Sequence, residues 1–422
     1  MLWKSIPSEQ IEENIFDVVN QLNIGRDLIT ETELKEGLLK LNLWAGKKAK
    51  GATAYEAAGR YLNLGLELLP TNSWESHYEL TRELYVETLE VEYLNTNFER
   101  AQKLSEFIFA RTTKLLEQVK VYELLIEFHT SQNQSKQALD TSLNVLEKFQ
   151  LTFPKKISKL TIIKEYLSIK FSLSRYSVDN LANLPEMNDP YKLAAIKIAI
   201  SAIPVAFGVN PNLFPLLIFK MVDLCLKHGN SPLSAYVFGS YSIILCSAIG
   251  DFETGYNFGV LSIELLNKYN AKEYKAKVYL MFNLFIKIWK KHLKETESEL
   301  VESFQYGWLN GDIQYACECA ITYCANILFR GKNLEETAKI QKDYLTIIIS
   351  SQKKYYINVA SAWNDCVQYL LSDSSERKLG ILAKLDQNYA DSFIQANNQA
   401  GILEISLIKL MIFIYLKILY KQ

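Results

Sequence analysis

A glycine- and lysine-rich segment at residues 46–51 is the part of this sequence that comes closest in composition to a phosphate-binding loop. It reads Gly46-Lys47-Lys48-Ala49-Lys50-Gly51. A P-loop requires a second glycine followed by Lys and Ser or Thr, placed after a strand, so that backbone amides wrap the phosphates. Here Ala52 follows the second glycine, and helical patterns flank the segment. We interpret it as a basic turn between two helices. The alternative is that Lys47, Lys48 and Lys50 contact an anion or a protein partner.

Six cysteines could in principle hold a metal. They are Cys225, Cys246, Cys317, Cys319, Cys324 and Cys366. Three of them fall within eight residues, but none forms a CxxC pair and no histidine lies beside them, which argues against structural zinc. We predict small buried thiols in a reducing compartment, with no metal and no cofactor.

Histidines and acidic residues are present without the spacing of known catalytic motifs. The histidines are His77, His129, His228 and His292, and the densest acidic run is Glu295, Glu297, Glu299 and Glu302. No HExxH, DDxxD, GxSxG, HRD or DFG motif occurs, and no histidine has the context of a kinase phospho-acceptor. The acidic run opens an expected helix, where carboxylates favour the helix dipole. We therefore predict no catalytic residue and no enzymatic activity.

The elements that carry these residues follow a period of about forty residues. Helical stretches open near Tyr191, Leu233, Glu273, Asp312 and Lys354, and each interval holds two amphipathic segments joined by a polar turn. Such a repeat is typical of an α-solenoid, in which stacked helical hairpins bury their faces against their neighbours. The aromatic groups Tyr355-Tyr356 and Phe304, Tyr306 and Trp308 could line a groove, although packing between helices is the simpler interpretation.

We predict an all-α fold, namely an α-solenoid of TPR-like helical hairpins wound as a right-handed superhelix. Three regions are expected: N-terminal helices at 1–72, TPR-like hairpins at 73–180, and regular hairpins of about forty residues at 181–422. The loop Leu181–Pro190 is the candidate boundary between the last two. The period exceeds the roughly 34 residues of the tetratricopeptide repeat, so the likeness to that repeat is incomplete.

Charge and hydropathy argue against two classes of partner. The formal net charge is −1, so the chain offers no basic field for nucleic acid. The lysine pairs at 155–156, 290–291 and 353–354 are interpreted as helix ends. The apolar segment Ile402–Tyr420 contains Glu404, Lys409 and Lys417, so we predict a buried helix and no membrane span. Without a secretory signal at Met1–Pro7, the expected location is the cytoplasm.

Several short motifs together resemble the helical-repeat segment of large multi-domain signalling kinases from cyanobacteria and other bacteria. They are Gly46–Lys50 with Thr53–Ala58, Leu184–Pro190, Asn210–Leu216, Gly229–Ala235, Asp251–Tyr256, and Asn270–Glu273 with Lys275–Tyr279. The resemblance spans roughly Ile11 to Leu371. In those kinases the repeats join a serine/threonine kinase, a STAND or AAA ATPase, a GAF sensor and a histidine kinase.

The resemblance implies a non-catalytic scaffold or sensor that contacts kinase, ATPase or histidine-kinase modules of the same system. It also implies that residues 1–72 link from an absent ATPase module and that the repeats stop early. The apolar run Leu410–Leu416 would then leave an uncovered edge, so we expect self-association through Ile402–Tyr420. A free-standing adaptor that docks onto a separately encoded kinase or ATPase is the alternative, and an all-α enzyme is a remote one. Gene context would separate the first two.

Overall fold

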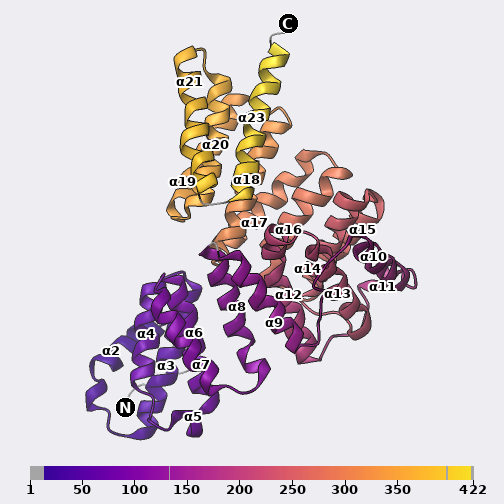
Figure 1. Ribbon diagram of the computed structural model, residues 1–422. Coiled ribbons are helices and arrows are strands. Elements are labelled where there is room, and N and C mark those ends of the chain that lie inside the picture. The colour runs from indigo at the N-terminus through magenta and orange to yellow at the C-terminus, as the bar shows by residue number, and fades with distance from the viewer. Residues whose placement is uncertain (1–13, 133, 396–397, 420–422) are drawn as a thin grey trace.

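The computed structural model describes residues 14–132, 134–395 and 398–419 (Figure 1). Within these ranges every regular element of secondary structure is a helix. The one β-type contact there is an isolated bridge between Glu186 and Asn230. The chain is therefore all-α, as the sequence predicts.

The N-terminal helices form the lower part of Figure 1. They are α2 (Ile15–Ile24), η2 (Arg26–Leu28), α3 (Thr32–Gly51), α4 (Tyr55–Glu67), α5 (Ser73–Ser76), α6 (Tyr78–Leu94) and α7 (Phe98–Arg111). The basic turn expected at residues 46–51 is wrong, because these residues are the last turns of α3. Gly46 allows close packing instead: a Cβ built there would lie 2.6 Å from Cγ of Leu62 on α4.

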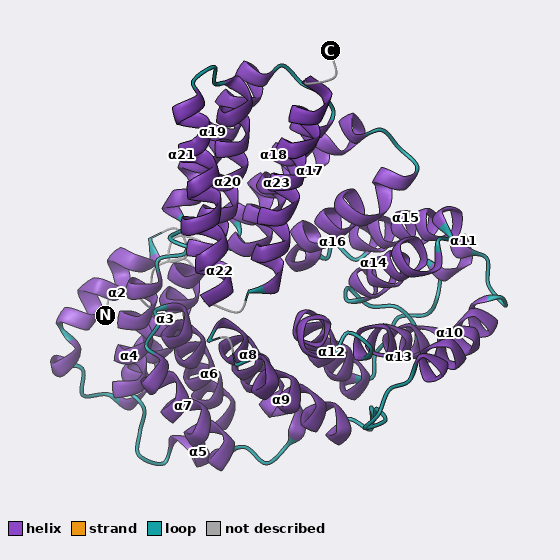
Figure 2. Cartoon of the chain, turned by 45° about the horizontal axis from the view of Figure 1, so that its top comes forward, coloured by secondary structure: helices purple, strands orange, loops and turns teal. Residues whose placement is uncertain are grey.

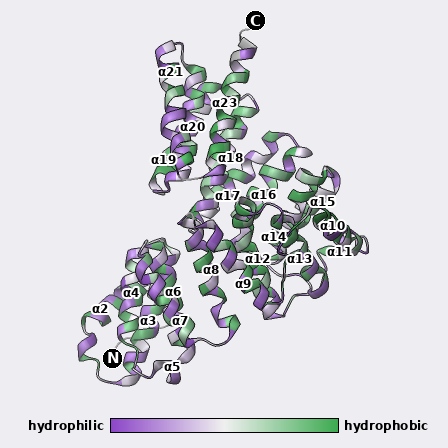
Figure 3. Cartoon of the chain, viewed as in Figure 1, coloured by the Kyte–Doolittle hydropathy of each residue, from purple (hydrophilic) through white to green (hydrophobic). Residues whose placement is uncertain are grey.

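The helices of the middle of the chain are α8 (Leu115–Ser131), α9 (Ser135–Lys148), α10 (Lys159–Leu173), α11 (Val178–Leu181), α12 (Pro190–Val209), α13 (Leu213–His228) and α14 (Ser234–Ile244). Of these, α12, α13 and α14 are strongly apolar, and Figure 3 draws hydrophobic residues in green. The start of α12 follows capping rules, since Asp189 Oδ1 accepts from the Tyr191 amide at 2.8 Å and Pro190 occupies the first turn.

The C-terminal part contains several short non-α turns. Its elements are η3 (Leu245–Ile249), α15 (Phe252–Lys268), η4 (Lys272–Tyr274), α16 (Lys275–Met281), η5 (Phe282–Ile286), η6 (Lys287–Trp289), η7 (Leu293–Thr296), α17 (Glu297–Leu309), α18 (Ile313–Phe329), α19 (Leu334–Ser350), α20 (Lys354–Leu371), α21 (Ser375–Lys384), η8 (Leu385–Ala390), α22 (Asp391–Gln395) and α23 (Gln399–Leu419). The helical stretch expected to open near Glu273 is thus divided into four short elements, η4, α16, η5 and η6.

Helices pack mainly against their neighbours in the chain. Hairpin pairs such as α3 with α4, α8 with α9, α14 with α15 and α17 with α18 are in contact, and α6 packs on α8, α8 on α12, α14 on α16, α16 on α18 and α18 on α20. The exception is the segment of α10 and α11, which folds back onto α13 and α15. Two hydrogen bonds of 2.7 Å hold it there, from Asn230 Nδ2 to Leu181 O and from Lys268 Nζ to Ala182 O.

The largest hydrophobic core runs continuously from Val119 to Met281, and a second begins at Leu280 and reaches Ile412. The expected boundary at residue 181 falls inside the first of these cores, and the three-region division remains a prediction. Among the described residues, α12 is the one helix long and apolar enough to cross a membrane. It packs against α8, α9 and α13, and core helices of soluble proteins pass the same test.

Candidate functional site

The three lysines singled out from the sequence all interact within the molecule. Lys47 Nζ lies 2.7 Å from Glu83 Oε1, and that hydrogen bond raises the pKa of Lys47. Lys50 Nζ lies 2.6 Å from Glu87 and 2.8 Å from Glu90. Lys48 Nζ lies 5.8 Å from the centre of the Phe16 ring. A partner would have to compete with these contacts, and partner binding by the three lysines remains a prediction.

Lys50 begins a series of alternating charges that connects four helices. This series, which we call the charge ladder, consists of Lys50, Glu87, Glu90, Lys120, Glu123 and Lys197. Lys120 Nζ on α8 lies 2.9 Å from Glu90 on α6, and Lys197 Nζ on α12 lies 4.0 Å from Glu123 on α8. Four ion pairs therefore connect α3 with α6, α6 with α8 and α8 with α12, and Lys120 and Glu123 are linked along α8 by the interaction of their charges.

The two inner carboxylates of the ladder differ in their electrostatics. Burial disfavours the charge of Glu90, but Lys120 and Lys50 outweigh this effect and lower its pKa. Burial raises the pKa of Glu123, and Lys197 and Lys120 offset only part of that rise. Glu123 is therefore the ladder carboxylate whose negative charge the neighbouring lysines do not fully stabilise.

A second polar group lies farther along the chain and consists of Asp312, Tyr315, Glu318, Tyr356 and Glu404. We call it the tyrosine–carboxylate cluster. Tyr356 on α20 donates from its hydroxyl to Glu318 Oε1 on α18 at 3.1 Å. Burial, together with the charges of Asp312 and Glu404, raises the pKa of Glu318 to about 7. Burial likewise raises the pKa of Glu404 and of Asp312.

The part of α8 that follows the ladder approaches the cluster, which lies almost two hundred residues later in the chain. Glu127, one turn beyond Glu123 on α8, influences the pKa values of both Asp312 and Tyr315. Lys277 Nζ on α16 lies 5.0 Å from the centre of the Tyr315 ring. In Figure 2 the helices that carry these residues, from α3 through α8, α12 and α16, follow one another along an arc. We call the ladder, Lys277 and the cluster together the polar track.

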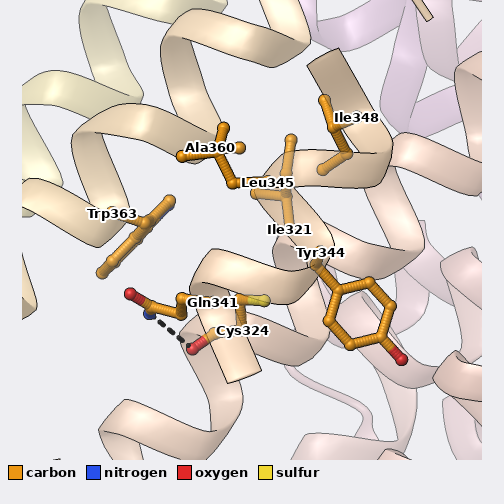
Figure 4. Close-up of a pocket in the computed structure, with 8 residues that line it drawn as sticks. All are labelled: Ile321, Cys324, Gln341, Tyr344, Leu345, Ile348, Ala360 and Trp363. Atoms are coloured by element: carbon orange, nitrogen blue, oxygen red, sulfur yellow. Dashed lines mark hydrogen bonds between the residues drawn. The ribbon is translucent and has the colours of Figure 1, made fainter. Parts of the chain in front are cut away.

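An enclosed pocket lies elsewhere, between α18, α19 and α20 (Figure 4). Its volume is about 10 Å³, which suits one water molecule at most. Gln341 Nε2 donates to Cys324 O at 3.2 Å, and Gln341 Oε1 faces the pocket without a hydrogen-bond partner in the described chain. The space is too small for a substrate or cofactor. A second, open depression is lined by residues of η7 and α17 and by Tyr323.

The predicted burial of the six cysteines is confirmed, and all are free thiols. Burial raises the pKa of Cys225 to about 12 and that of Cys317 to about 11, which keeps both thiols protonated and unreactive. Within residues 14–132, 134–395 and 398–419, no group of three or more His, Cys, Asp or Glu side chains could hold a metal ion.

Sequence reasoning missed the polar track. Glu83, Glu87 and Glu90 are spaced by four and three residues, which places them on one face of α6 facing the lysines of α3. That spacing was a usable signal. Glu318 gives no such signal, because its environment is made by Tyr356 and Glu404 from later helices.

Comparison with known proteins connects the chain to signalling. No known protein family matches the sequence. Among curated proteins, the chain is similar to the "Hybrid signal transduction histidine kinase G" of Dictyostelium discoideum, with 25% identity over 377 residues. The match covers 81% of this chain but 11% of that kinase. The similarity indicates a signalling-related region, whereas the sequence resemblance pointed to bacterial proteins.

Proposed function

We propose that this chain is a non-catalytic helical-repeat region of a multi-domain signal-transduction kinase. In this proposal its TPR-like hairpins form an α-solenoid that binds a protein segment along the polar track. The observation that carries the proposal is the track itself, because it combines charged and aromatic side chains from eight helices between α3 and α23. An extended partner can contact such a surface at many points, whereas a small substrate cannot.

The chemistry of the track suits a partner segment of mixed charge. Lys120 and Lys197 are nearly half exposed and can pair with acidic residues of a partner. Glu123 and Glu318 are carboxylates whose charged forms are disfavoured by burial, so a basic partner residue would stabilise them. We propose kinase, ATPase or histidine-kinase modules of the same cytoplasmic system as the source of that segment.

Acid–base catalysis by Glu318 is the competing use of the same residues. A carboxyl group with a pKa near 7 is suited to proton transfer. However, neither the enclosed pocket nor the open depression includes Glu318. In addition, Glu318 Oε1 already accepts a hydrogen bond from the Tyr356 hydroxyl. Binding therefore accounts for this group better than catalysis does.

Charge reversal on the track tests the proposal. The double variant Lys197→Glu/Lys277→Glu should weaken binding to a kinase or ATPase module of the same system at least tenfold, measured by calorimetry. The matched control Lys136→Glu changes an exposed lysine of α9 away from the track and should bind as the wild type does. Equal affinity of all three proteins, with equal circular dichroism melting curves, would refute the proposal. If the chain instead binds a kinase encoded by a separate gene, that result would favour the alternative that the chain is a free-standing adaptor.

A further inference from the structure

An exposed apolar stripe lies on α10, a helix that contributes no residue to the polar track. Leu160, Ile163, Leu167 and Phe171 are 78%, 52%, 56% and 66% exposed. Their spacing of three, four and four residues places all four on one face of the helix. The opposite face is the packed one, since Ile169 and Leu173 are buried against the core. A stripe of four large exposed side chains on one helix indicates an interaction surface.

Basic residues border this stripe on both sides. At about 100° per residue, Lys159 and Lys170 fall along one edge of the stripe and Lys164 falls along the other, and Arg175 follows the end of the helix. Lys155 and Lys156 precede the helix, and all six side chains are exposed. The segment 155–175 contains one carboxylate, Glu165, which lies 4.0 Å from Lys220 of α13. The segment is thus strongly basic in a chain of net charge −1.

The shape of the surface favours a flat partner. Among the α-helices, α10 has its main contacts with α13, and α10 lies at the margin of the molecule in both Figure 1 and Figure 2. Many partner helices and peptides bind in a groove between two elements, whereas a single helix at the margin of the molecule can lie flat on a membrane surface. The Arg175 guanidinium lies 5.3 Å from the centre of the Phe171 ring, so a cation and an apolar ring occupy the same end of the stripe.

We propose that α10 is a membrane-surface helix that docks this region onto a bilayer containing anionic lipids. Its four apolar side chains enter the boundary between headgroups and acyl chains, and the bordering cations contact lipid phosphate and carboxylate groups. One short helix gives weak and reversible binding, which suits a module that responds to signals. This inference goes beyond partner binding along the polar track and is independent of it.

Vesicle flotation with the full chain tests the proposal. Wild-type protein should float with phosphatidylcholine vesicles containing phosphatidylserine, and should bind them at least tenfold more tightly than phosphatidylcholine vesicles. Added salt should reduce the binding. Leu167→Gln/Phe171→Gln and Lys164→Glu/Lys170→Glu should each reduce it at least tenfold while melting curves remain unchanged, because these side chains are exposed. The matched control Leu309→Gln/Leu379→Gln alters two exposed apolar side chains, on α17 and α21, and should bind as the wild type does.

Four results would overturn the proposal. They are absence of flotation by the wild type, equal binding to both vesicle types, unchanged binding by the α10 variants, and loss of binding by the control variant. Two further results would assign the stripe to other occupants and equally overturn it. One is a fall in molar mass on Leu167→Gln/Phe171→Gln, which would indicate a second copy of this chain. The other is a purified kinase module that binds wild type but not this variant.

Discussion

Glu90 and Glu318 are both partly buried carboxylates, yet their surroundings move their pKa values in opposite directions. Two lysines within 3 Å lower the pKa of Glu90, whereas Glu318 has a tyrosine hydroxyl and two nearby acids. Glu90 therefore connects helices as an ion, and Glu318 spends part of the time protonated at neutral pH. The polar track therefore contains two kinds of carboxylate. Glu90 is stabilised by lysines of the same chain, whereas the charged form of Glu318 has no such lysine in the described part of the chain and would be stabilised by a cation of a partner.

Replacing Glu318 with Gln should change how stability depends on pH. The folded protein raises this pKa from 4.5 to about 7, so ionisation costs stability progressively between those pH values and fully above them. Gln cannot ionise but can still accept from Tyr356. Relative to wild type, the variant should gain up to roughly 3 kcal/mol in the free energy of unfolding between pH 4.5 and pH 7.5, measured by urea titration. A difference that stays constant over this range would contradict this explanation.

Replacing Gly46 with Ala should disturb the packing of α3 against α4. A Cβ there would lie 2.6 Å from Cγ and 2.7 Å from Cδ2 of Leu62, which is fully buried. Gly46→Ala should therefore destabilise the protein by about 1–3 kcal/mol, despite the better helix propensity of alanine. The matched control is Gly380→Ala in α21, where a Cβ meets no atom within 4 Å. The control should stabilise the protein slightly. The two variants can be compared with the wild type in thermal melts, and a higher melting temperature for both would contradict this explanation.

At the scale of elements, the sequence predicted most helices but not the π-helical turns. The sequence predicted helical stretches that open near Leu233 and Glu273, whereas the structure interrupts both with π turns, at η3 and η5. These wider turns press against two glycines of α15. A Cβ at Gly255 would lie 2.4 Å from Cys246 Sγ, and one at Gly259 would lie 2.8 Å from Ile286 Cγ2. The fit between a glycine and a turn on another helix has no periodic signature in one sequence.

The last helix, α23, presents the surface for which self-association was predicted. Ile405, Ile408 and Ile412 are buried, whereas Leu410 and Phe413 are exposed. The final residue of the predicted segment, Tyr420, lies outside the described residues. Light scattering should find a molar mass that rises with concentration for wild type and stays monomeric for Leu410→Gln/Phe413→Gln. A wild-type monomer at every concentration would count against this surface.

At the scale of the whole molecule, two turns far apart in sequence approach each other. A Cβ built at Gly311, between α17 and α18, would lie 3.5 Å from Thr53 Cγ2, between α3 and α4. Spin labels attached to cysteines at Thr53 and Asn310 should therefore give a distance at the short limit of pulsed dipolar spectroscopy. The six native cysteines are buried and should not react with the label. A broad distribution centred on long distances would show that the arc is open in solution.

The sequence predicted the all-α class and the buried thiols because both follow from local pattern and composition. It identified Lys47, Lys48 and Lys50 but not their partners on α6, and it missed Glu318 entirely. The pKa of Glu318 depends on Asp312, Tyr356 and Glu404, which come from one loop and two other helices and meet only in the folded chain. Contacts of this kind require the three-dimensional arrangement of hairpins.

The central claim is that the polar track binds a protein segment, and site-specific photo-crosslinking tests it most directly. A photoreactive amino acid would replace Tyr315 on the track, or Tyr176 next to α10 as the control, in cells that contain the native signalling proteins. The account predicts cross-links from position 315 to one region of a kinase or ATPase module, and none to that region from position 176. Cross-links to that module from position 176 alone, or an absence of cross-links from position 315, would contradict it.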